Sequence, residues 1–154
     1  MPTQEASRWL EAIDRPSLVA SLEAVYAFIA DQIEARGPAC WASGRCCNFR
    51  RADHRLYTTG LEAAYCIARL ERPIEPGELD RAIERGGCVF QLANICGVHA
   101  IKPSGCRVYF CDRSAQTWQN ELSERAVEEI RRIHDRERIE YRYAEWGALL
   151  RMFI

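Results

Sequence analysis

Residues 17–36, SLVASLEAVYAFIADQIEAR, carry the clearest structural signal in the chain. Apolar side chains recur three and four positions apart along this stretch, which is the period of one face of an α-helix. That face consists of Leu18, Leu22, Val25, Tyr26, Ile29 and Ile33. Ser17 is the expected N-cap, and Gly37 followed by Pro38 is a strong stop signal. The stretch predicts one long amphipathic helix and a mainly α fold.

Two shorter helices are expected in the middle of the chain. TTGLEAAYCIARLE (58–71) predicts a helix capped by Thr58 or Thr59. EPGELDRAIERGG (75–87) predicts a helix that begins near Pro76 and ends at the Gly-Gly pair.

Helix is expected again after Asp112, in two parts. Val127, Ile130 and Ile133 form one apolar stripe, and Ile139, Tyr143, Trp146 and Leu150 form a second stripe that is offset from the first. A break near residues 134–138 would reconcile the two. Residues 128–142 hold ten charged side chains, five of each sign, which is typical of a solvated helix face with local ion pairs.

Between Cys88 and Cys111 the helical period disappears, and glycine and proline interrupt the sequence. We expect loops there, with a short strand at RVYFC (107–111). The chain of 154 residues suits a single domain, 1–154. Within it, residues 40–111 form a cysteine-cluster region and residues 112–154 a C-terminal helical segment. The expected architecture is a small mainly α domain of about four or five helices around an irregular, cysteine-rich, metal-binding core.

Composition limits the classes of partner. The formal net charge is −1, so the chain as a whole has no strong attraction for nucleic acid or for an anionic membrane. The N-terminal residues show no basic leader followed by a long apolar stretch, so we expect no secretory signal. No run approaches the roughly 20 apolar residues of a membrane-spanning helix. We therefore expect a cytoplasmic protein, in which thiols stay reduced. Eight cysteines in such a chain indicate metal or redox chemistry more than structural disulfides.

Six cysteines lie in or next to irregular segments and are the predicted metal ligands: Cys40, Cys46, Cys47, Cys88, Cys96 and Cys106. Tight turns allow several sulfur atoms to converge on one site, where backbone N–H groups stabilise the thiolates. The spacings match neither a zinc ribbon nor a ferredoxin-type run. The other two cysteines, Cys66 and Cys111, are expected to be core residues.

The adjacent pair Cys46 and Cys47 bears on the type of metal. Neighbouring side chains diverge, so a single tetrahedral ion would take both thiolates only with backbone distortion. An iron–sulfur cluster spreads its thiolate ligands over several positions and accepts adjacent cysteines more easily. Two interpretations therefore stay open: one of the two cysteines binds the metal and the other is a packed thiol, or both bind it. A disulfide between the two would be strained.

Histidine and arginine residues surround the predicted ligands. His99, three positions after Cys96, has the spacing of a metal ligand or is a hydrogen-bonded loop residue. His54 and His134 lie among charged residues and are expected to be exposed. Five arginines flank the cysteines: Arg45, Arg50, Arg51, Arg55 and Arg107. They would offset the negative charge of a thiolate-bound metal, or form a solvated basic loop; contact with phosphate or RNA is a third reading that the near-neutral charge disfavours.

Three segments together resemble a known family. CWASGRCC (40–47), CVFQ (88–91) and CGVHAIKPSGCR (96–107) are similar to the motifs of the YkgJ-type cysteine-cluster family, the CxxCxxCC zinc- or iron-chelating domain. The resemblance places all six predicted ligands on family cysteines. Three positions depart from the pattern: Ser43 replaces a motif cysteine, His99 a tyrosine and Val89 a proline. Some relatives are named flagellin lysine methylases, but no glycine-rich loop for S-adenosylmethionine is visible here, so that activity is not carried over.

The sequence thus predicts a metal-binding cysteine-cluster protein, with an iron–sulfur cluster slightly favoured over zinc and a redox, electron-transfer or structural role. A zinc-stabilised module that binds an unknown protein partner, and a metal-free thiol-redox protein, are the alternatives. No Ser-His-Asp arrangement, phosphate-binding loop or H-E-x-x-H motif is present. Catalytic residues, and whether the protein is an enzyme, are left open.

Overall fold

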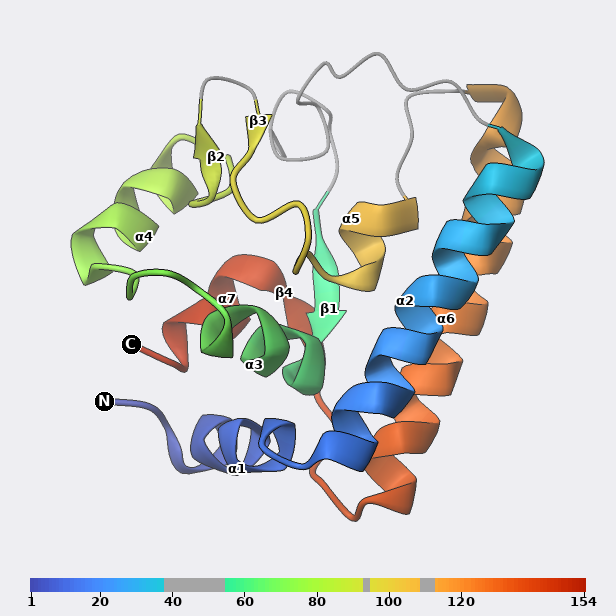
Figure 1. The fold of residues 1–154 in the computed structure, drawn as a ribbon. Coiled ribbons are helices and arrows are strands. Elements are labelled where there is room, and N and C mark those ends of the chain that lie inside the picture. Colours follow the sequence, from blue (N-terminus) through green and yellow to red (C-terminus); the bar gives the residue numbers. More distant parts are fainter. Residues whose placement is uncertain (38–54, 93–94, 109–112) are drawn as a thin grey trace.

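Two long helices form one side of the molecule. In the computed structural model, α2 (Pro16–Arg36) and α6 (Gln116–Arg136) lie antiparallel and side by side (Figure 1). The structure describes residues 1–37, 55–92, 95–108 and 113–154. Helices dominate these residues, so the predicted mainly α class is confirmed.

The other elements are short and lie beside this pair. They are α1 (Gln4–Ile13), α3 (Gly60–Ala68), α4 (Pro76–Glu84), α5 (Ser104–Val108), the 3-10 helix η1 (Arg113–Ala115), α7 (Trp146–Arg151) and the strands β1 (Tyr57–Thr59), β2 (Gln91–Leu92), β3 (Ile95–Cys96) and β4 (Tyr143–Glu145). The strands form two antiparallel pairs, β1 with β4 and β2 with β3. The α1 helix packs on α3, and α5 lies between the long helices and β1.

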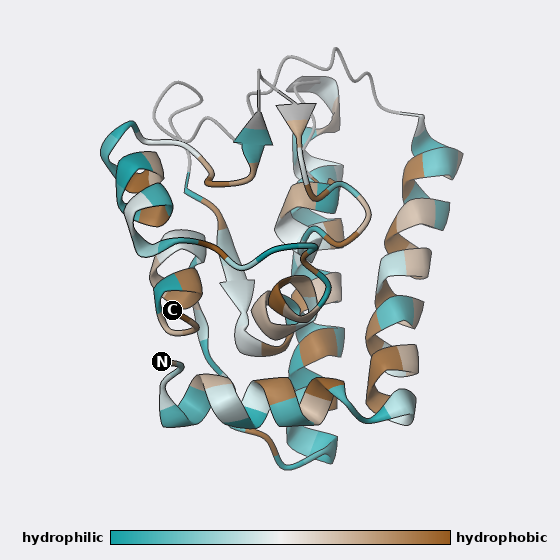
Figure 2. Ribbon diagram, turned by 60° about the vertical axis from the view of Figure 1, so that its left-hand side comes forward, coloured by the Kyte–Doolittle hydropathy of each residue, from teal (hydrophilic) through white to brown (hydrophobic). Residues whose placement is uncertain are grey.

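The core lies where these helices meet. Apolar and polar residues alternate along both long helices, so that each buries one face (Figure 2). The largest fully buried side chains include Trp9, Leu22, Ile130 and Trp146. In the described part of the chain, no helix has the length and apolar character that crossing a membrane requires.

Each strand of the first pair leads directly into a helix. β1 continues into α3 and β4 into α7, and Thr58 lies opposite Ala144 in the ladder. The amide of Gly60 donates to the carbonyl of Arg142 at 3.1 Å, which extends the pairing into the first turn of α3. A Cβ atom at Gly60 would overlap the indole ring of Trp9, so glycine is required for the close approach of α1 to α3.

The long helix predicted first is confirmed, with one correction at its start. Pro16 occupies the first helical position, where its missing N–H costs nothing, and Arg15 is the N-cap. The prediction that Ser17 is the N-cap was therefore wrong, since Ser17 lies inside the first turn. Gly37 ends the helix as expected, in the left-handed conformation with φ of 62°.

The middle helices and the break are also confirmed. Thr59 caps α3 and α4 begins at Pro76. α6 ends at Arg136, within the expected break, and Arg138 follows with φ of 57°. The second C-terminal stripe is only partly helical, because Tyr143 belongs to β4, which pairs with β1 rather than continuing α6.

The strand expected at residues 107–111 was wrong where the structure describes it. Arg107 and Val108 are the last residues of α5. Residues 109–111 lie outside the described part. The backbone amide of Ser104, the first of α5, donates a hydrogen bond to the distant carboxylate of Glu62, and this contact stabilises the helix. The local sequence does not reveal it.

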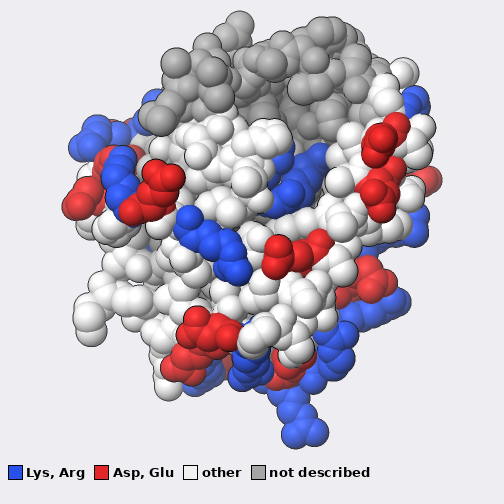
Figure 3. All heavy atoms as spheres, viewed as in Figure 1, with Lys and Arg blue, Asp and Glu red and all other residues white. Residues whose placement is uncertain are grey.

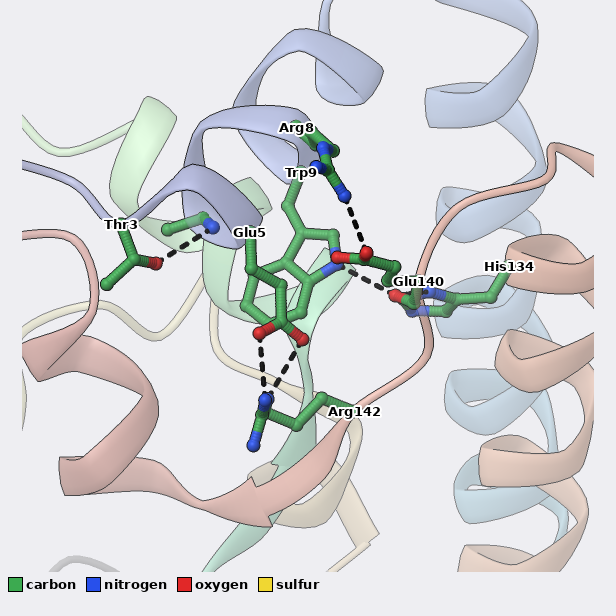
Figure 4. A network of polar contacts seen from close by, with 8 residues as sticks. Thr3, Glu5, Arg8, Trp9, His134, Glu140 and Arg142 are labelled. Carbon is green, nitrogen blue, oxygen red and sulfur yellow. Dashed lines mark hydrogen bonds and ion pairs between the residues drawn. The ribbon is translucent and has the colours of Figure 1, made fainter.

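A polar clamp joins the N-terminal helix to the segment after α6 (Figure 4). The carbonyl oxygen of Glu140 accepts hydrogen bonds from Trp9 Nε1 and His134 Nδ1, both at 2.9 Å. Arg8 pairs with the carboxylate of Glu140. Nearby, Arg142 donates two hydrogen bonds to Glu5, at 2.9 and 2.8 Å. α1, which the sequence analysis did not identify, is held in place by these contacts and by the burial of Trp9.

His134 was expected to be exposed, and this was wrong: its side chain is fully buried. Its ring meets that of Tyr141 edge-on, with centroids 5.2 Å apart. Because a carbonyl only accepts, Nδ1 carries the proton and Nε2 is an acceptor, for which no partner exists among the described residues. Burial lowers the pKa of this imidazole below its usual value, so the ring is neutral in the folded protein.

The buried histidine predicts a pH dependence of stability. The unfolded chain binds a proton at His134 more readily than the folded chain, so the free energy of unfolding decreases as the pH falls through the ordinary histidine pKa of about 6.5. His134→Asn keeps an N–H donor near the Nδ1 position but cannot titrate. We expect the decrease between about pH 7 and pH 5, measured by urea unfolding, to be smaller in this variant. An equal decrease in the variant and the wild type would contradict the assignment.

Candidate functional site

A buried carboxylate organises the region that carries the predicted ligands. Glu62, in the first turn of α3, is fully buried and accepts five hydrogen bonds. One carboxylate oxygen accepts from the backbone amide of Ser104 at 2.6 Å and from the hydroxyl of Tyr26 at 3.3 Å. The other accepts from the hydroxyls of Thr58 and Thr59, at 2.8 and 3.0 Å, and from the Thr59 amide at 3.3 Å. The start of α3 is thereby joined to β1, α2 and α5.

This network fixes α5 and with it Cys106 and Arg107. The amide of Ser104 is the first of α5 and has no partner within the helix, so Glu62 supplies the missing acceptor. The next residue, Gly105, packs against Leu56 so closely that a Cβ atom would come within 2.6 Å of a Leu56 methyl carbon. Cys106 follows and is half-buried. The position of one predicted ligand therefore depends on a residue 44 positions earlier in the sequence (106 − 62).

Arg107 lies over Tyr26, on the same network. Its guanidinium carbon is 3.8 Å from the centre of the Tyr26 ring, and the group donates to the carbonyls of Lys102 at 2.8 Å and Ala100 at 3.1 Å. Burial, together with the charge of Glu62, raises the pKa of Tyr26 well above its usual value, so the phenol keeps its proton and donates a hydrogen bond to the carboxylate. Arg107 opposes that shift and supplies positive charge next to the cysteine-bearing segments.

Three thiols share the neighbourhood of this arginine. Cys66, in α3, is fully buried, as predicted for a core residue. Burial, followed by the charges of Cys88 and Cys96, raises the pKa of its thiol to about 12, and Arg107 acts in the opposite direction. Cys88, which precedes β2, is buried, and Cys96 in β3 is half-buried opposite Gln91. The fold thus brings thiols from three separate segments within electrostatic range of one another.

Thiolates are the ligands of zinc and of iron–sulfur clusters, so the type of donor at this place fits the predicted metals. Across the described ranges, however, no three His, Cys, Asp or Glu side chains converge closely enough to hold a metal ion. Four cysteines lie outside the described residues: Cys40, Cys46, Cys47 and Cys111. A complete ligand set would therefore need the described thiols together with some of these four.

Some of the histidine and arginine residues that flank the cysteines also lie outside the described part of the chain. Arg45, Arg50, Arg51 and His54 lie outside the described residues, as does Ser43. Arg55 is exposed and its guanidinium is 3.9 Å from the carboxylate of Glu145. His99 is exposed, and the charge of Lys102, then burial and the charge of Arg107, lower its pKa. Among the described cations, Arg107 acts on Cys66, and Lys102 and Arg107 act on His99.

Chains related to this one would help to assign the site. No protein-family model, no curated protein and no solved structure gives a significant match. The assignment therefore depends on the residues of this chain alone.

Two features of the site were missed in the sequence. The pattern Thr59-x-x-Glu62 before an apolar run is a capping-box signature and could have marked the start of α3. Nothing local indicates that the same glutamate also reaches Tyr26 and Ser104. The neighbourhood of Cys66 with Cys88 and Cys96 is equally non-local, because α3 and the β2–β3 pair are distant in sequence.

The surface near the site has no dominant charge of one sign. On the face drawn in Figure 3, basic and acidic side chains are interspersed rather than gathered into one field. This distribution agrees with the net charge of −1 and gives no support to a nucleic-acid interface there.

Removal of the Glu62 charge is predicted to destabilise the fold. Glu62→Gln keeps the shape but leaves one acceptor oxygen and places two N–H groups among the donors. We expect a loss of about 2–4 kcal/mol in the free energy of unfolding, measured by denaturant titration. The control is Glu129→Gln on the exposed face of α6, where the loss of one surface pair with Arg132 should change stability by at most about 0.5 kcal/mol. Equal, small effects of both variants would contradict the role of Glu62.

Proposed function

We propose that this protein is a metal-binding cysteine-cluster protein, with an iron–sulfur cluster slightly favoured over zinc. The proposed ligands are drawn from Cys40, Cys46, Cys47, Cys88, Cys96 and Cys106. The observation that carries the proposal is the shared neighbourhood of the Cys66, Cys88 and Cys96 thiols beside Arg107. A cytoplasmic location is part of the proposal, since reduced thiols are needed to bind the metal.

The electrostatic surroundings of the Cys66 thiol favour the binding of a metal cation. Burial, and then the charges of Cys88 and Cys96, raise the pKa of the Cys66 thiol, so Cys66 resists ionisation unless positive charge is present. Arg107 supplies part of that charge, and a metal ion would supply the rest by binding the thiolates directly. An iron–sulfur cluster would add the capacity to accept and donate one electron, whereas zinc would stabilise the fold.

Cys66 becomes a further candidate ligand. The sequence assigned it to the core, and its burial agrees with that assignment. Its proximity to Cys88 and Cys96 adds a second role, as a ligand or as a packed thiol next to the ligands. Cys66→Ala separates these roles, because loss of metal would identify a ligand and retention of metal a packed residue.

Metal analysis tests the proposal directly. Protein purified without oxygen should contain iron and acid-labile sulfide in matched amounts and absorb broadly in the visible range. Colourless protein with stoichiometric zinc would support the same ligand set with the other metal, and would favour an interaction module. Folded protein without metal under these conditions would contradict the proposal and favour a thiol-redox protein.

Cys106→Ser is expected to lower metal content and thermal stability together, because assembly of a metal site and folding are coupled. Ser123→Ala, in the half-buried part of α6, is the control and should leave metal content unchanged. Metal content is measured by elemental analysis, and stability by thermal unfolding with and without a chelator. Wild-type metal content in Cys106→Ser would remove Cys106 from the ligand set.

A further inference from the structure

A cavity of about 430 Å³ lies beside the cysteine-bearing segments. Its lining comes from residues 69–74 in the connection from α3 to α4, from Glu78 in α4, and from residues 89–90 before β2 and 97–101 after β3. Its size falls within the range of small-molecule sites in proteins. Val89 directly follows Cys88 and Gly97 directly follows Cys96, so the cavity borders the proposed metal site without including its ligands.

The walls are apolar and incompletely buried. Six side chains line the cavity and pack on the core while keeping part of their surface exposed: Leu70, Ile74, Val89, Phe90, Val98 and Ile101. Phe90 is supported from behind by Trp146, with ring centroids 6.0 Å apart. Exposed apolar surface that gathers in one concavity is a feature of ligand sites, whereas single exposed apolar residues are ordinary.

The rim carries two arginines, Arg69 and Arg72, and two glutamates, Glu71 and Glu78. Arg72 and Glu78 neutralise each other through two hydrogen bonds of 2.9 and 2.7 Å. Arg69, whose guanidinium lies 3.9 Å above the centre of the Tyr65 ring, has no ion pair with any carboxylate in the described ranges. Glu71 is the one acidic residue on the rim besides Glu78 in the part of the chain that the structure describes.

Two further cations, Lys102 and Arg107, lie near His99, which also lines the cavity. Lys102 and Arg107 both act on the His99 ring, and neither has an ion pair with a described carboxylate. Arg107 donates to the carbonyl of Ala100, another lining residue. Arg69 in the lining, and Lys102 and Arg107 beside it, are thus three cations without an ion pair in the described ranges. Glu71 is the one acidic lining residue besides the paired Glu78 there, and the His99 imidazole adds a hydrogen-bonding group. An anionic headgroup would be stabilised on this side.

We propose that this cavity binds an organic carboxylate with an apolar body, of the class of medium-chain alkyl carboxylates. The carboxylate would lie toward Arg69 and His99, and the apolar chain would lie on the walls formed by the six side chains. This inference goes beyond the metal-binding function and does not depend on it, because the cavity is lined by none of the proposed ligands.

The test uses octanoate as the probe, with the full-length protein and isothermal titration calorimetry. We expect saturable binding of one octanoate per chain, with a dissociation constant of about 0.1–1 mM. Acetate has the charge without the chain, and octylammonium has the chain with the opposite charge. Both should bind at least about tenfold more weakly. Absence of saturable octanoate binding, or equal affinity for octylammonium, would overturn the proposal.

Variants locate the site. Arg69→Gln should weaken octanoate binding about tenfold through loss of a charge-assisted contact, and Val98→Glu should weaken it at least as much by placing a carboxylate in the cavity. Arg132→Gln on the exposed face of α6 is the matched control and should bind octanoate as the wild type does. Circular dichroism verifies that each variant is folded. Wild-type affinity in both folded cavity variants would overturn the assignment to this cavity. Octanoate binding is measured before and after chelator treatment, so that the result for this cavity is obtained independently of whether the protein binds a metal.

Discussion

The carboxylate of Glu62 is the interaction on which this structure most depends. A buried charge is costly unless hydrogen bonds replace the water it has lost. Here five donors do so, and they come from α2, β1 and α5 as well as from the cap of its own helix. Because every donor must be present together, the network specifies how the two parts of the molecule meet: the long helices on one side, and the short strand–helix units on the other.

The network also positions residues on the side of the molecule that carries the cysteines. It positions α5, which carries Cys106 and Arg107, and Arg107 in turn lies over Tyr26 and acts on the buried thiol of Cys66. The apolar cavity adjoins this region through Val89 and Gly97. The proposed metal site and the proposed carboxylate site are therefore neighbours, with Arg107 near both, although each can be tested without the other.

The local parts of this arrangement could be predicted from the sequence. The 3.6-residue period and Gly37 were sufficient for α2, Thr59 for the start of α3, and Pro76 for the start of α4, because each signal acts within a few residues. The burial of His134, the helical state of Arg107 and the proximity of Cys66 to Cys88 and Cys96 could not be predicted. The position of α5 depends on the carboxylate of Glu62, which is distant in the chain, and the three thiols come from separate segments. His134 is buried although its neighbours in the sequence are charged. The predicted ligands Cys40, Cys46 and Cys47 lie outside the described residues and stay predictions.

The central claim is that Glu62 anchors α5 from outside that helix. Native-state hydrogen exchange at the Ser104 amide tests it most directly, since this N–H would be an unpartnered first-turn amide in a helix of five residues. The account predicts that the Ser104 amide exchanges as slowly as core amides of α2 such as that of Leu22, through global unfolding. Exchange as fast as that of Gly77, in the first turn of α4, would contradict it.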